Sequence, residues 1–67
     1  MSETSQKIEA LIFASSKPIS EKEIKLRLDI HEDISDAMNN LEDAYQHRGI
    51  NLKKISKGWI FLTNTEV

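Results

Sequence analysis

Histidines and clustered carboxylates are the side chains of this 67-residue sequence that could do chemistry. His31 and His47 lie far apart, and neither has a second ligand at a metal-like spacing. Glu32, Asp33 and Asp36 fall in the first turn of a predicted helix, where negative charge favours the helix dipole. Catalytic carboxylate pairs need a cleft, which so short a chain hardly provides. We therefore expect no enzyme activity, no metal and no cofactor.

Lysines offer a different chemistry, which is contact with phosphate. Residues 49–65 carry three lysines and no acid, whereas residues 32–48 carry five acids and one arginine. The helix that would read DNA falls in the acidic stretch, where it would repel phosphate. At most we expect weak, non-specific contact with the DNA backbone through Lys53, Lys54 and Lys57.

Two helices are predicted in the first half of the chain. The first covers residues 5–16 and ends before Pro18, because the residue before a proline is pushed out of the helical region. The second begins after Ser20, which has capping-box spacing with Glu23. The aliphatic residues that follow also alternate as they would in a strand, but the cap favours a helix. Leu26 is then left on its outer side.

A third helix is predicted over residues 33–48, with Gly49 as the left-handed residue that ends it. Apolar residues recur at helical spacing in all three helices and should form the core. These core positions are Ile8, Leu11, Ile12, Ile24, Leu28, Ile34, Met38, Leu41 and Tyr45.

The C-terminal part of the chain predicts a β-hairpin. A two-residue turn at Lys57-Gly58 would pair Ile55 with Ile60. The order helix, short strand, helix, turn, helix and hairpin is that of a winged helix-turn-helix, an α+β fold in which the hairpin is the wing. We expect residues 1–67 to form one such domain.

Side chains alternate along a strand, so the hairpin has two apolar faces. Ile50, Leu52, Trp59 and Phe61 would share the face that packs on the helices. The opposite face would carry Ile55, Ile60 and Leu62, an unusual apolar patch for a small domain. One alternative is a three-residue turn, which would regroup the faces and shrink the patch. The other is a contact surface for a second copy or another protein, to which Leu26 is a weaker candidate contributor.

The composition indicates a cytoplasmic protein. The chain has no cysteine, which fits a reducing compartment. Residues 1–5 have no signal-peptide character, and no apolar run approaches the length of a membrane span.

Several segments resemble the family of segregation and condensation protein B (ScpB). They are the run Ile8-Glu9-Ala10-Leu11-Ile12-Phe13-Ala14-Ser15, then Lys17-Pro18-Ile19-Ser20, Leu41-Glu42-Asp43-Ala44-Tyr45, Arg48-Gly49-Ile50-Asn51-Leu52 and Gly58-Trp59-Ile60-Phe61-Leu62-Thr63. Together they extend from Ile8 to Thr63.

The resemblance implies a non-enzymatic scaffold subunit in bacterial chromosome segregation and condensation, associated with the nucleoid. The partners it implies are the kleisin ScpA, the SMC ATPase and a second copy, since these proteins dimerise largely through the first of two winged-helix domains. The second domain, which does much of the kleisin binding, would begin beyond Val67. The alternative function is that of a DNA-binding winged-helix transcriptional regulator.

Overall fold

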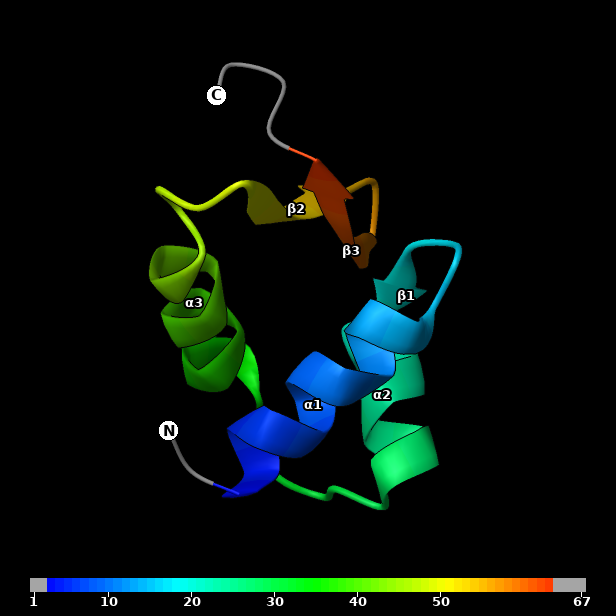
Figure 1. The fold of residues 1–67 in the computed structure, drawn as a ribbon. Coiled ribbons are helices and arrows are strands. Elements are labelled where there is room, and N and C mark those ends of the chain that lie inside the picture. The colour runs from blue at the N-terminus through cyan, green and yellow to red at the C-terminus, as the bar shows by residue number, and fades with distance from the viewer. Residues whose placement is uncertain (1–2, 64–67) are drawn as a thin grey trace.

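The structure is a computed structural model that describes residues 3–63. The elements are, in order, α1 (Glu3–Ala14), β1 (Ile19–Ser20), α2 (Glu21–Leu28), α3 (Ser35–Ala44), β2 (Ile50–Ile55) and β3 (Gly58–Thr63). The strands form one antiparallel sheet in the order β1-β3-β2. In Figure 1, α1 lies between α3 and α2, and the sheet closes one end of the helical layer. The predicted α+β winged-helix fold is confirmed.

Helix α2 begins as the sequence predicts. The Ser20 hydroxyl accepts a hydrogen bond from the Glu23 backbone N–H at 3.1 Å, which satisfies one of the free donors of the first turn. The carboxylate of Glu23 accepts from Arg27 Nε at 2.9 Å, one turn further along. Asp29 ends the helix in the left-handed region, with φ of 55°.

Helix α3 begins later than predicted. Asp33 Oδ1 accepts from the Ser35 hydroxyl at 2.8 Å and from the Ser35 backbone N–H at 3.0 Å. Because Asp33 bonds to the chain two residues ahead, it stands outside the helix, as turn-forming aspartates do. These bonds, the hydroxyl first, hold the pKa of Asp33 below its usual value.

Helix α3 also ends earlier than predicted, at Ala44, and residues 45–47 form turns. Asn51 Nδ2 donates to the carbonyl oxygens of Tyr45 and Gln46 at 2.5 and 3.1 Å. A longer helix would need those carbonyls for its own ladder. Gly49 does not have a positive φ, so the prediction of a left-handed cap there was wrong.

The core lies between the helices and one face of the sheet. Six of the nine predicted helical core residues are buried, while Leu11, Leu28 and Tyr45 are partly buried. The buried apolar residues of the core are Ile8, Ile12, Ile19, Ile24, Ile34, Met38, Leu41, Leu52 and Trp59. Helices and hairpin therefore share one core.

The turn of the hairpin lies one residue earlier than predicted, at Ser56-Lys57. Ile55 pairs with Gly58, and Lys53 rather than Ile55 pairs with Ile60. Ser56 has φ of 56°, as the first central residue of a type II′ turn does.

Gly58 also lies close to the neighbouring strand β1. It lies opposite Ser20 of β1, where a Cβ atom would come within 2.7 Å of Pro18 Cβ. The glycine is therefore needed for close contact between β1 and β3 rather than for the turn.

Candidate protein-interaction surface

The shifted turn leaves the two faces of the hairpin as predicted. Moving the turn by one residue changes each pairing partner by two positions, and two positions return to the same face of a strand. The inner face carries Leu52 and Trp59, which are 1% and 4% exposed. The alternative of a three-residue turn with regrouped faces is excluded by the observed register.

The outer face of the hairpin carries Ile55, Ile60 and Leu62, which we call the outer wing patch. Ile60 lies opposite Lys53 and diagonal to Ile55, and Leu62 follows on the same face of β3. Ile55 is 44% exposed, Leu62 is 40% exposed and Ile60 is half-buried. None of the three belongs to the core cluster of residues 3–63.

Leu26, the weaker interface candidate, lies apart from the outer wing patch. It is 68% exposed on α2, the outer side that the helical spacing predicts. It lines a shallow hollow of about 480 Å³ together with Ile30, and no hairpin residue lines this hollow. The structure thus brings three of the four candidates together and leaves Leu26 on a separate surface.

The three candidate lysines for DNA contact point in different directions. Lys53 lies on the outer face beside Ile60, and Lys57 is in the turn. Lys54 lies on the inner face, with its Nζ atom 5.8 Å from the centroid of the Trp59 ring. Lys54 thus interacts with an aromatic ring of its own domain.

The outward side of α3 is acidic and polar, as the sequence indicates. The exposed residues of α3 are Ser35, Asp36, Asn39, Asn40, Glu42, Asp43 and Ala44, and Gln46, His47 and Arg48 are exposed after the helix ends. Helix α3 itself carries no lysine or arginine, although a helix lying in a DNA groove is flanked by phosphates; Arg48 comes only after the helix ends. This surface is poorly suited to duplex DNA.

The other polar candidates stay at the surface. His31 lies 3.0 Å from Asp29 Oδ1, and His47 is exposed in the turn after α3. Within residues 3–63, no three histidine or acidic side chains come together as a metal site would require. None of the described helices is both long and apolar enough to span a bilayer.

One exposed aromatic residue was not singled out by the sequence analysis. Phe13 on α1 is 70% exposed, and its ring meets Phe61 edge to face at 6.1 Å. The ring of Phe61 also packs edge to face on that of Tyr45, with 4.9 Å between the two ring centroids. Phe13 lies off the apolar stripe of Ile8 and Ile12, so the helical spacing was the signal that could have revealed its exposure.

Three helices and a three-stranded sheet ending in a hairpin define a winged-helix domain, here with an apolar outer wing and an acidic third helix. A solved structure of a conserved hypothetical protein from Chlorobium tepidum has a similar fold, with a TM-score of 0.81 and 25% sequence identity. The likeness covers 96% of this chain and 43% of that protein.

The family model of the segregation and condensation complex subunit ScpB matches residues 6–67, and the chain belongs to this family. The resemblance seen in the sequence is thereby confirmed, as is the link to chromosome segregation and condensation. No curated protein matches the chain.

Proposed function

We propose that this chain is a non-enzymatic scaffold domain of a bacterial SMC–kleisin complex that segregates and condenses chromosomes. Its partners are the kleisin ScpA, the SMC ATPase and a second copy of itself, in the cytoplasm at the nucleoid. Membership of the ScpB family supports the complex. The chain spans less than half of the similar Chlorobium protein. The contacts with the kleisin, the SMC ATPase and a second copy are therefore part of this proposal.

The observation that carries self-association is the exposure of the outer wing patch. Ile55 and Leu62 keep 44% and 40% of their surface exposed beside the half-buried Ile60. Complete burial of such a side chain contributes about 1.5–3 kcal/mol. In a two-fold symmetric dimer every contact occurs twice, which makes a small patch effective.

Sedimentation velocity of the chain over a range of concentrations tests this proposal. We expect the wild-type chain to associate, and Ile60→Glu to be monomeric with unchanged helical circular dichroism, because a buried unpaired carboxylate is costly. Since Ile60 is half-buried, Leu62→Glu serves as a second variant at a more exposed position. If both variants fold and still associate as the wild type does, the outer wing patch is the wrong surface.

Leu26→Glu provides the matched control, because it places the same charge on an exposed leucine outside the patch. It should associate as the wild type does. Loss of association in Leu26→Glu alone would move the interface to α2 and contradict the proposal.

The regulator hypothesis has a separate test in fluorescence anisotropy with a short DNA duplex. We expect no submicromolar binding at physiological salt, because the exposed side of α3 is acidic. Tight binding that disappears when Lys53, Lys54 and Lys57 are changed to glutamate would instead favour a DNA-binding regulator.

A further inference from the structure

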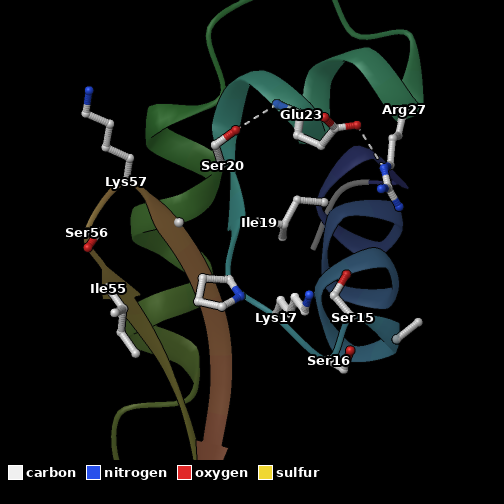
Figure 2. A pocket seen from close by; sticks show the side chains of 13 residues that line it. Ser15, Ser16, Lys17, Ile19, Ser20, Glu23, Arg27, Ile55, Ser56 and Lys57 are labelled. Atoms are coloured by element: carbon white, nitrogen blue, oxygen red, sulfur yellow. Dashed lines mark hydrogen bonds and ion pairs between the residues drawn. The ribbon is translucent and has the colours of Figure 1, made fainter.

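An open groove of about 790 Å³ lies where the hairpin turn approaches the segment between α1 and β1. Figure 2 shows Ser15, Ser16 and Lys17 on one side of it, and Ile55 and the turn on the other. The start of α2 closes one end. Residues far apart in the sequence therefore form one concave surface, separate from the centre of the outer wing patch at Ile60, which does not line it.

The groove is positively charged, whereas the chain as a whole carries a formal charge of −2. Its lining contains Lys17, Arg27 and Lys57 against one acid, Glu23. Glu23 forms an ion pair with Arg27, whose Nε atom lies 2.9 Å from the Glu23 carboxylate. Lys17 and Lys57 have no ion-pair partner in residues 3–63, so two positive charges remain available to a ligand.

The floor of the groove is apolar. Pro18, Ile19 and Ile55 contribute to its lining, and 44% of the surface of Ile55 is exposed. A phosphate backbone would be attracted by the lysines but would bury no apolar surface against this floor. An aliphatic side chain would bury apolar surface against the floor, and carboxylates beside it would be attracted by the lysines.

We propose that this groove binds a short extended segment of another protein, in which an aliphatic side chain is flanked by carboxylates. The aliphatic side chain packs on Pro18 and Ile55. The carboxylates lie toward Lys17 on one side and Lys57 on the other. This contact shares Ile55 with the outer wing patch, whereas its charged residues Lys17 and Lys57 do not belong to that patch.

The test is a nuclear magnetic resonance titration of the isotope-labelled chain with a short peptide of alternating leucine and glutamate. We expect saturable amide shifts confined to residues 15–20 and 55–58. A peptide with glutamine for glutamate, and one with glycine for leucine, should each bind about tenfold more weakly, which is about 1.4 kcal/mol. No saturable shift in the groove up to about 1 mM of the leucine–glutamate peptide overturns the proposal.

Variants locate the binding charges. Lys17→Glu and Lys57→Glu should each weaken binding about tenfold. Lys53→Glu and Lys22→Glu make the same charge change at exposed lysines outside the groove lining and should have little effect. Equal weakening by all four variants would mean that net charge alone attracts the peptide, and the groove proposal would be wrong.

Two further measurements separate this proposal from its alternatives. A DNA duplex that shifts the groove amides where the peptide does not would assign the groove to nucleic acid and overturn the proposal. Titration of Ile60→Glu distinguishes the groove from self-association, because a monomeric variant, in which no second copy covers Ile55, should bind the peptide at least as tightly as the wild type does. Loss of peptide binding in a folded, monomeric Ile60→Glu would show that the groove is not an independent site.

Discussion

Leu52 and Leu62 are the same residue type on the same hairpin, yet Leu52 is 1% exposed on the inner face and Leu62 is 40% exposed on the outer face. The inner face is covered because α1 packs on β3 and α3 packs on β2. On the outer face, Pro18 lies close to Gly58 and the Asn51 amide bonds to the turn after α3, but Ile55 and Leu62 stay exposed. The comparison shows that apolar composition does not decide which face is buried; the placement of the helices does.

The largest expected effect is the loss of a side chain from the inner face. Leu52→Ala should lower the free energy of unfolding by about 2–5 kcal/mol, because a cavity remains in a packed core. Leu62→Ala should change it by less than about 0.5 kcal/mol in the monomer. Chemical denaturation at low protein concentration checks both values. Comparable losses for the two variants would show that the outer face is also part of the monomer core.

The two faces were predictable from the sequence even though the turn was not. Alternation has a period of two, so an error of one residue in the turn changes each partner by two positions and leaves Ile55, Ile60 and Leu62 together. Pro18 lies far from Gly58 in the sequence and comes close to it only where β1 pairs with β3. No local pattern contains that contact.

In the candidate site too, some features follow from local sequence patterns and others arise only when the sheet has folded. The exposure of Leu26 followed from the helical spacing and the cap at Ser20. The groove could not be predicted from the sequence, because it combines Lys17 and Lys57 from two loops that only the folded sheet brings together. The separation of Lys54 from Lys53 does follow from strand alternation, but the contact of Lys54 with Trp59 depends on the pairing register.

Gly58 lies where β1 approaches the outer face, and it offers a second test of the comparison. Gly58→Ala places a Cβ 2.7 Å from Pro18 Cβ and 2.9 Å from the Pro18 carbonyl carbon. Since β1 must move to relieve this overlap, we expect a loss of about 1–3 kcal/mol in denaturation experiments.

Gly49→Ala is the matched control. A Cβ at Gly49 meets nothing within 4 Å, and its φ is not positive. The variant should be neutral or more stable by up to about 1 kcal/mol, because alanine restricts the unfolded chain. Equal destabilisation by both substitutions would show that the approach of β1 does not account for Gly58.

A smaller effect is expected where the inner face ends in a polar contact. Trp59 Nε1 donates to Glu21 Oε2 at 3.1 Å, which ties β3 to the first turn of α2. Trp59→Phe should cost about 1 kcal/mol from this bond, in addition to the change in ring size. In a double-mutant cycle with Glu21→Ala, the second substitution should cost little once the donor is gone. Additive losses would mean that the hydrogen bond contributes nothing to stability.

The smallest effect should distinguish two neighbouring lysines on opposite faces. Lys54 lies over the Trp59 ring, with Nζ 5.8 Å from its centroid, whereas Lys53 lies beside Ile60 on the outer face. Lys54→Gln removes a cation from an aromatic face and should cost about 0.5–1 kcal/mol, while Lys53→Gln should leave the stability of the monomer unchanged. Trp59 is the sole tryptophan of the chain, so its fluorescence should respond to Lys54→Gln alone. A response to Lys53→Gln of the same size would mean that the strand does not keep its two faces apart in solution, and the outer wing patch would then lose its basis.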